Sequence, residues 1–307
     1  MSKIISAIDI GSNAMRMMIA EVSFKGQQPH LIKTIKKIRS PVRLGKDVFL
    51  DQPISNKTLQ ESLDTFKHFK NINEKYKVSQ CRAVATSALR ESKNKDEFVK
   101  LIQKNTGIKI EIIDGIEEAQ LIHLAVTREL DLTTSSNVLI DIGGGSVEVT
   151  FSKKGKLTSS KSFPIGTVRI LDYLIKRNLT EENLKVIIGD FITPLTDYIN
   201  KNRPHNHLSF AIGTGGNLEC MARLKLDLLK KIPNTYLSLK ELVTISDKIK
   251  NLSIQDRIQK LHLRPDRADV ILPAILIVKT IMRHAEVDKI VIPCVGLRNG
   301  ILWSMIL

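Results

Sequence analysis

The sequence of 307 residues contains one short pattern twice, and this repeat constrains the fold more than any other feature. An apolar stretch ends in Asp9-Ile10-Gly11 near the start, and another ends in Asp141-Ile142-Gly143 near the middle. Small polar residues and a second apolar stretch follow each of them, which is typical of a strand, a turn and a second strand. The repeat predicts two similar halves, and two such halves facing each other would place both turns on one cleft.

Each half is predicted to open with three consecutive strands, at residues 4–10, 15–22 and 31–38 and again at 138–142, 147–152 and 157–163. Apolar residues at helical spacing, beginning at Leu59, predict the first helix. The remaining predicted elements are strands at residues 82–85, 109–113, 208–212 and 289–293, helices at 95–105, 117–130, 180–200, 239–252 and 268–282, and a short apolar helix ending at residue 307.

No low-complexity linker separates the two halves, so their boundary is expected in or near the helix around residues 120–130. This arrangement predicts an α/β protein with two domains. Domain I is expected at residues 1–124 plus about 294–307, with the last residues packing back on it, and domain II at residues 125–293.

The chain is strongly basic, with 47 Lys and Arg against 32 Asp and Glu, a formal net charge of +15. This excess attracts anions such as nucleic acid, an acidic membrane or polyphosphate, and a lysine-rich soluble surface explains it equally well. The charge is dispersed and no nucleic-acid-binding motif appears, so we expect no nucleic-acid partner. The longest apolar run, residues 270–278, is too short to cross a bilayer, so we expect no membrane partner.

The cysteines and the first residues bear on the cellular compartment. Cys81, Cys220 and Cys294 are far apart and lack the spacing of a zinc or redox site, which predicts buried thiols. Residues 1–8 lack the apolar length of a secretory signal. Both features predict a reducing, cytoplasmic location.

The two repeated turns are candidate phosphate-binding loops. Glycine lets backbone approach a ligand closely, so such a turn can point several N–H groups at one phosphate, and an aspartate at the strand end can hold hydrated Mg²⁺ against it. A tight hairpin without a ligand is the alternative for each turn taken alone. The candidate residues are Asp9, Gly11, Ser12 and Asn13 in the first turn and Asp141, Gly143, Gly144, Gly145 and Ser146 in the second.

A third glycine turn, Gly213-Thr214-Gly215-Gly216-Asn217, follows a predicted strand and opens a predicted helix at residues 218–224. Backbone N–H groups at a helix start favour an anion, which makes Gly213, Gly215 and Gly216 candidate phosphate-binding residues. A simple helix-opening turn is the alternative.

Three acidic residues and one arginine are further candidates. Glu148 lies two residues beyond Ser146 on a predicted strand, so both side chains face the same side, and a carboxylate beside bound phosphate can orient and deprotonate a water. Glu117-Glu118 opens a helix, where compensation of the helix dipole is the alternative. Arg90 is a phosphate clamp or a surface arginine.

Taken together, these motifs resemble the exopolyphosphatase and guanosine pentaphosphate phosphohydrolase (Ppx/GppA) family in its short two-domain form. The resemblance is collinear from residue 5 to about 302. The segments that carry it are Asp9 to Asn13, Ala85 to Arg90, Gly115 to Ala119, Asp141 to Glu148, Gly213 to Asn217, Arg267 to Pro273 and Gly296 to Gly300.

The resemblance implies two actin-like (ribonuclease H-like) domains with an interdomain cleft, from the superfamily of actin, sugar kinases and heat-shock chaperones. It implies that Glu118 is the catalytic glutamate acting on water, and that Asp141 and Glu148 organise a divalent cation, Mg²⁺, and the nucleophile, with Asp9 as a further metal candidate. Arg90 then corresponds to the phosphate-binding arginine. The two repeated turns correspond to the two phosphate loops.

Two departures from the family pattern bear on substrate preference: Asp47 replaces the second glycine of the segment Arg43-Leu44-Gly45-Lys46-Asp47, and Gln120 stands where the family often has arginine. Inorganic polyphosphate is the first expected substrate, because aromatic residues are only 5% of the chain and no aromatic pair near Gly213 to Asn217 indicates a base-stacking slot. Guanosine pentaphosphate is the alternative within the family. A non-catalytic actin-like nucleotide sensor is the alternative of another class. Such a sensor could dispense with a general base, so the presence of both Glu118 and Glu148 argues against it. A homodimer is one option for the oligomeric state.

Overall fold

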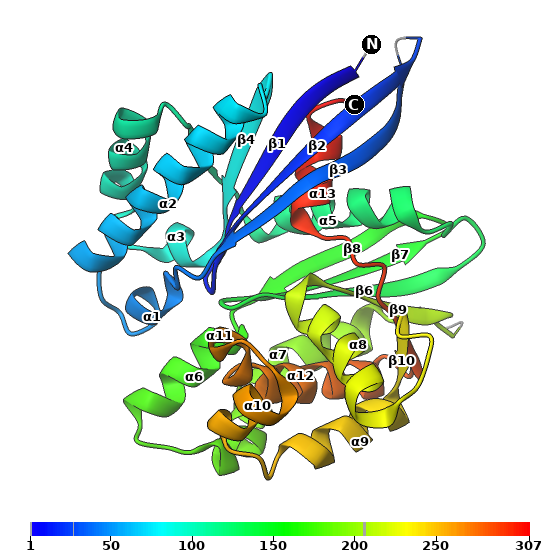
Figure 1. Cartoon of the computed structure of the whole chain (residues 1–307). Coiled ribbons are helices and arrows are strands. Elements are labelled where there is room, and N and C mark those ends of the chain that lie inside the picture. The colour runs from blue at the N-terminus through cyan, green and yellow to red at the C-terminus, as the bar shows by residue number, and fades with distance from the viewer. Residues whose placement is uncertain (1, 27, 205–206) are drawn as a thin grey trace. The chain divides into compact units, whose positions relative to one another are not determined.

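A computed structural model describes residues 2–26, 28–204 and 207–307 of the chain (Figure 1). The chain forms two compact units. The first contains Met1–Ala125 and Leu297–Leu307, and the second contains Val126–Gly296. The division falls within helix α5 (Gly115–Glu129).

The sheet of the first unit has the strand order β3-β2-β1-β4-β5. The strands β1, β2 and β3 form an antiparallel meander, and β4 and β5 continue the sheet parallel to β1. The bounds are β1 (Ser2–Ile10), β2 (Met15–Lys25), β3 (Gln28–Ser40), β4 (Gln80–Ala85) and β5 (Ile110–Ile112).

Helix α2 (Asn56–Lys75) packs its apolar face into the core of the first unit, where Phe66 and Phe69 are fully buried. Ser55 caps this helix by accepting a hydrogen bond from the Thr58 N–H. The other helices of this unit are α1 (Gly45–Val48), α3 (Ser87–Glu91), α4 (Lys95–Thr106) and α13 (Leu297–Ser304), besides α5.

Helix α13 comes from the far end of the sequence and contacts β1, β2 and β4 (Figure 1, red). Its Gly300 lies directly against α5, because a Cβ atom built there would be 1.9 Å from the carbonyl oxygen of Leu121. Only glycine allows this approach. The last helix therefore packs on both the sheet and α5 of the first unit.

The sheet of the second unit has the order β10-β11-β9-β6-β7-β8. Its meander β6-β7-β8 is antiparallel, β9 and β11 continue it parallel to β6, and β10 pairs antiparallel with β11. The bounds are β6 (Ser136–Ile142), β7 (Val147–Lys153), β8 (Lys156–Phe163), β9 (Phe210–Thr214), β10 (Tyr236–Ser238) and β11 (Lys289–Val291). Apart from β10, this order repeats that of the first unit, which confirms the predicted α/β fold with two similar halves.

The second unit has a larger set of helices. The apolar helix α12 lies in its core, where Ile271, Ile275 and Ile281 are fully buried, and it contacts α6, α7, α8 and α9. The bounds are α6 (Thr167–Lys176), α7 (Leu184–Asn202), α8 (Gly215–Leu229), α9 (Leu239–Ile249), α10 (Ile254–Leu261), α11 (Pro265–Ala268), α12 (Ile271–His284) and the 3-10 turn η1 (Glu181–Asn183).

Two details differ from the sequence expectations. Strand β9 extends to Thr214 and α8 begins at Gly215, so Gly213 is a strand residue, because its pairing with Ile140 on β6 prolongs the ladder. The prediction of three buried thiols is wrong for Cys81 and Cys294, which are exposed, and right for Cys220. Cys81 lies near the exposed start of β4, and Cys294 lies in the loop that follows β11.

Among the described residues, no helix has the length and apolar character needed to cross a bilayer.

Candidate active site

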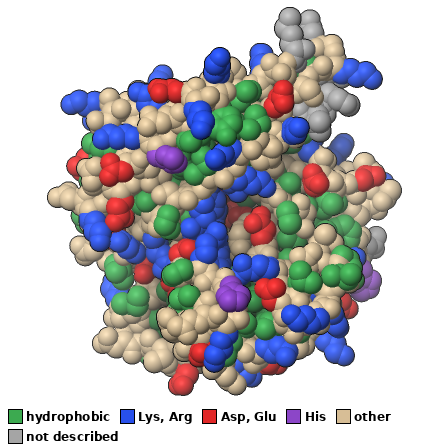
Figure 2. Space-filling model, in the orientation of Figure 1, with side chains coloured by type: hydrophobic (Ala, Val, Ile, Leu, Met, Phe, Trp, Pro, Cys, Tyr) green, Lys and Arg blue, Asp and Glu red, His purple; other side chains and the backbone are tan. Residues whose placement is uncertain are grey.

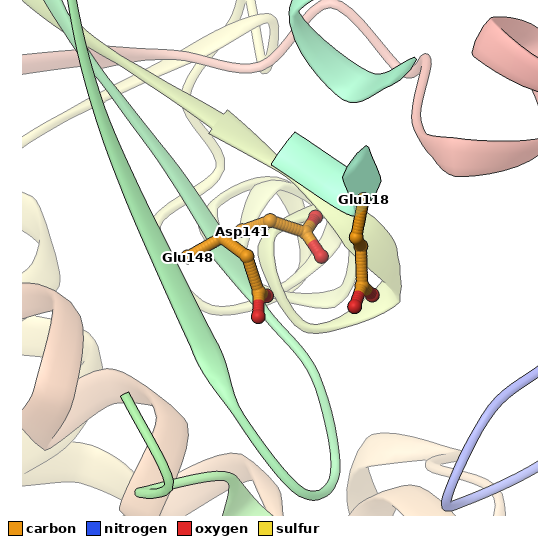
Figure 3. Close-up of side chains that lie close together, drawn as sticks. All are labelled: Glu118, Asp141 and Glu148. Atoms are coloured by element: carbon orange, nitrogen blue, oxygen red, sulfur yellow. The ribbon is translucent and has the colours of Figure 1, made fainter. Parts of the chain in front are cut away.

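Asp141 and Glu148 form a carboxylate pair at the end of the β6-β7 hairpin in the second unit (Figure 3). The two residues are direct partners in the antiparallel ladder, so their side chains project to the same face of the sheet. One carboxylate oxygen of each lies within 4.8 Å of one of the other. Carboxylate oxygens at this separation can share one hard cation.

Both carboxylates are oriented by hydroxyl groups from the neighbouring strands. Thr214, which pairs with Asp141 from β9, donates a short hydrogen bond to Asp141 Oδ1. Ser162, which pairs with Glu148 from β8, donates to Glu148 Oε1 at 2.7 Å. Glu148 is only 2% exposed. These two hydrogen bonds therefore fix the orientation of both carboxylates.

Gly215 makes room for the Asp141 carboxylate. This residue has φ +85, a backbone conformation that favours glycine. A Cβ atom at this position would lie 2.9 Å from Asp141 Oδ1. The third glycine turn thus supports the carboxylate of the second turn, which the sequence analysis did not anticipate.

The loop Gly143–Ser146 closes tightly, because the Gly143 N–H donates to the Ser146 carbonyl at 3.0 Å. The carbonyl oxygens of Gly143 and Gly144 accept backbone hydrogen bonds from the start of α6. Within the described parts of the chain, the N–H groups of Gly144 and Gly145 have no hydrogen-bond acceptor. Neighbouring N–H groups in such a turn form a concave donor site for an anion.

The other glycines of the third turn lie close to this loop in the fold. Gly213 packs between Ile290 and Leu218, because a Cβ atom built at Gly213 would lie 2.8 Å from each of these side chains. Gly216 lies in the first turn of α8. One residue further on, the Asn217 amide donates to the Ile142 carbonyl at 3.0 Å and therefore ties α8 to the strand end before Gly143.

The first repeated turn, in the first unit, is held by a different set of contacts. Asp9 is 6% exposed and forms an ion pair of 3.2 Å with Arg16, its ladder partner on β2. Ser12 hydrogen-bonds the Ser87 hydroxyl at 2.9 Å. Asn13 is buried beside it. The predicted metal ligand Asp9 is thus paired with an arginine side chain.

Two further backbone contacts shape this turn. The Gly11 N–H donates to the Ala14 carbonyl at 3.2 Å, which closes the turn, and the Ser12 carbonyl accepts from the Gly45 N–H at 2.9 Å. The segment that departs from the family pattern at Asp47 therefore packs directly on the first turn.

Arg90 lies in the last turn of the short helix α3, and its Nη1 donates to the Ile113 carbonyl at 2.6 Å. This bond fixes one outer nitrogen of the guanidinium group against the strand-to-helix connection before α5. A guanidinium group has five N–H donors, so further donors are available to a ligand after this contact.

The two glutamates at the start of α5 have different surroundings. Asp114 caps the helix by accepting from the N–H groups of Ile116 and Glu117. Glu117 is partly exposed and forms an ion pair of 3.1 Å with Arg82. Glu118, also labelled in Figure 3, is 6% exposed. Dipole compensation and the Arg82 pair explain Glu117, whereas neither explains a buried carboxylate at Glu118.

Sequence reasoning missed several residues that shape the second-unit site, namely Thr214, Ser162, Gly166, Thr167 and Arg169. Thr214 lies inside the third glycine motif, so its place before Gly215 was an available signal. The other four belong to β8 and to the start of α6. Nothing local in the sequence marks them, because the β7-β8 register and the packing of α6 place them at the site.

Comparisons with known proteins identify one family that matches most of the chain. The sequence profile of the Ppx/GppA phosphatase family matches residues 22–307. A bifunctional 3-dehydroquinate synthase/phosphatase of Fusobacterium nucleatum subsp. nucleatum is 31% identical over 300 residues, which cover 94% of this chain and 44% of that protein. The chain therefore spans less than half the length of this curated relative.

Two solved structures are similar over nearly their whole length. An exopolyphosphatase from Cytophaga hutchinsonii is 26% identical with a TM-score of 0.85, covering 99% of this chain and 98% of that one. A Ppx/GppA family member from Aquifex aeolicus is 26% identical with a TM-score of 0.79, covering 100% of this chain and 98% of that one.

Proposed function

Because the chain belongs to the Ppx/GppA phosphatase family, we propose that it is an exopolyphosphatase, which hydrolyses the terminal phosphoanhydride bond of inorganic polyphosphate. The water oxygen forms a bond to the terminal phosphorus, and the bond from this phosphorus to the bridging oxygen breaks. The products are orthophosphate and a chain shorter by one phosphate.

One observation carries this proposal. The oriented pair Asp141 and Glu148 lies at the strand ends of one hairpin. Its loop offers the N–H groups of Gly144 and Gly145, which have no acceptor among the residues that the structure describes. Carboxylates suit a cation and outward N–H groups suit phosphate oxygens. A phosphate bound together with a divalent cation satisfies both halves of this hairpin at once.

The donor set fits a divalent cation, and we propose Mg²⁺. Asp141 and Glu148 offer carboxylate oxygens, the ligands that hard cations prefer, and would hold the ion. Asp9 is a weaker candidate because Arg16 already neutralises it. When bound, the cation would neutralise charge on the phosphate oxygens.

We propose that Glu118 orients the attacking water and accepts its proton, as the family resemblance implies. Its burial, with 6% of the residue exposed, is consistent with this role, because a base must be held in place to act on one water. Arg90 and the first turn, with Gly11, Ser12 and Asn13, are proposed to bind further phosphate groups. The Ile113 contact supports this role for Arg90, because it holds the guanidinium group in one orientation.

Two features favour polyphosphate over guanosine pentaphosphate. The structural neighbour from Cytophaga hutchinsonii is described as an exopolyphosphatase. The formal charge of +15 attracts polyanions, and Figure 2 shows many Lys and Arg side chains on the visible face, of which a long phosphate chain can contact more than guanosine pentaphosphate can. Guanosine pentaphosphate remains the competing substrate.

Several sequence predictions remain proposals alongside this function. We propose that the two compact units are two actin-like domains, with boundaries at residues 1–124 plus about 294–307 and at 125–293. A cytoplasmic location and a homodimer also remain proposals.

Phosphate release from long polyphosphate, guanosine pentaphosphate and ATP, measured with Mg²⁺ and with EDTA, tests the proposal. We expect Mg²⁺-dependent release with the highest kcat/KM on long polyphosphate. Faster turnover of guanosine pentaphosphate would reassign the substrate within the family. Absence of release from all three would refute the hydrolase proposal.

A further inference from the structure

The start of helix α6 makes an unusual set of contacts with the glycine loop of the candidate site. We propose that Gly166, Thr167 and Arg169 are positioning residues that turn the N–H groups of the loop toward the bound phosphate without contacting it. This inference rests on the proposed function, since it assigns the phosphate site to Gly143–Ser146.

Three consecutive loop carbonyls accept hydrogen bonds from this helix start. The Gly143 carbonyl accepts from the Thr167 N–H at 3.1 Å. The Gly144 carbonyl accepts from the N–H groups of Val168 and Arg169, at 2.8 and 3.1 Å. The Gly145 carbonyl accepts from Arg169 Nε at 2.9 Å. The N–H groups of a helix start commonly bind an anion, and here they bind backbone carbonyls instead.

The geometry of the peptide bond converts these contacts into an orientation of the loop N–H groups. A trans peptide is planar, and its N–H points opposite to its C=O. Because the carbonyls of Gly143, Gly144 and Gly145 face α6, the N–H groups of Gly144, Gly145 and Ser146 face away from it. Three donors in a row then form the anion site, and α6 fixes their direction from behind.

Gly166 permits this close packing. A Cβ atom at this position would lie 2.3 Å from the carbonyl carbon and oxygen of Gly144 and 2.3 Å from the carbonyl carbon of Gly145. The clash involves backbone atoms, which cannot rotate away as a side chain can. Alanine at position 166 therefore requires the loop or the helix start to move.

Arg169 supplies the only side-chain nitrogen among these contacts, and its bonding atom is Nε rather than the outer guanidinium nitrogens. A glutamine side chain carries its amide nitrogen the same number of bonds from Cα as Arg Nε. Arg169→Gln therefore keeps the donor and removes the charge, whereas Arg169→Met keeps the length and removes both. The pair separates a positioning role from direct attraction of phosphate by charge.

Binding of inorganic phosphate in the presence of Mg²⁺ provides a test that needs no turnover. We measure the dissociation constant by calorimetry and the amide proton shifts of Gly144 and Gly145 by NMR with glycine-selective ¹⁵N labelling. Arg169→Met should weaken phosphate binding by about three- to tenfold, the range for one hydrogen bond, and reduce both amide shifts. Arg169→Gln should bind within about twofold of the parent. Gly166→Ala should lose most of the amide shifts.

Lys176→Met is the matched control, because this exposed residue in the last turn of α6 loses the same charge far from the loop. It should bind phosphate like the parent. Equal losses in Arg169→Gln and Arg169→Met would indicate a charge effect and overturn the positioning role, as would parental binding in Arg169→Met. If the parent binds phosphate without a shift of the Gly144 and Gly145 amide protons, this inference is overturned and the hydrolase proposal is not. If the parent binds phosphate with these shifts but releases no phosphate in the turnover assay, the hydrolase proposal fails and this inference does not.

Discussion

Replacing Gly215 with alanine should weaken metal binding far more than it destabilises the fold. The new Cβ would lie 2.9 Å from Asp141 Oδ1, whereas ordinary contacts begin at about 3.4 Å, so the carboxylate must retreat by about 0.5 Å. Such a shift disturbs its short hydrogen bond from Thr214. Loss of an outer-shell hydrogen bond typically lowers metal affinity by about 10- to 100-fold.

The stability cost of the same change is smaller. Alanine with φ near +85 costs about 1–2 kcal/mol relative to glycine. A change of 1 kcal/mol lowers Tm by about 2–4 °C in a folding unit of ordinary domain size. Gly215→Ala should therefore remain folded at room temperature and show a modestly lower Tm.

Titration with Mn²⁺ followed by electron paramagnetic resonance measures the metal affinity, and Mg²⁺ activation of phosphate release provides the parallel assay, since both ions prefer oxygen ligands. Gly189→Ala is the matched control. Gly189 lies inside α7, and a Cβ atom built there has no neighbour within 4 Å. It should raise stability by about 0.5–1 kcal/mol and leave metal binding unchanged. Metal affinity within about threefold of the parent in Gly215→Ala would refute the argument.

The remaining predictions concern catalysis, metal and substrate. Glu118→Gln should lower turnover by roughly two to four orders of magnitude, the scale of a positioned base, while Glu117→Gln stays within about threefold of the parent. Asp141→Asn should weaken the Mg²⁺ dependence of activity, because an amide is a poorer ligand for a hard cation. The KM for long polyphosphate should rise more between about 0.05 and 0.2 M salt than the KM for guanosine pentaphosphate, since dispersed surface charge is screened over about 10 Å at 0.1 M.

Each of these predictions has a contrary outcome. Turnover of Glu118→Gln within about threefold of the parent removes this glutamate from the mechanism, and equal loss in both glutamate variants assigns the effect to the helix start. Parental activity in EDTA equal to that in Mg²⁺ contradicts the metal assignment. Equal salt slopes for the two substrates contradict capture of a polymer by surface charge.

The repeat of Asp-Ile-Gly was sufficient to predict the central strands of both units, because strand and turn propensities are local. The pairing of Asp141 with Glu148 also follows from local sequence, since a tight turn between them fixes the antiparallel register. The same reasoning, applied to the first turn, would have paired Asp9 with Arg16. Without this register, the sequence predicts Asp9 as a metal ligand and gives no sign of its ion pair with Arg16.

The contacts of α6 with the glycine loop could not be predicted in this way. Gly166 and Arg169 act on a loop about 20 residues earlier in the sequence, and the whole β7-β8 hairpin lies between them. Their approach depends on how α6 packs after β8, which propensities do not encode. The two exposed cysteines illustrate the same limit, because a residue type predicts only average burial. It does not say that Cys81 lies near an exposed strand start or that Cys294 lies in a loop.

The dependence of the first unit on α13 has a consequence for synthesis of the chain. The ribosome makes β1 to β5 first, yet the helix that packs on β1 and against Leu121 is translated only after the entire second unit. Domains usually fold in the order in which they emerge. Here the second unit, which is continuous in sequence, can complete its core while the first still exposes the surface that α13 covers. The half that begins first is therefore the half that finishes last.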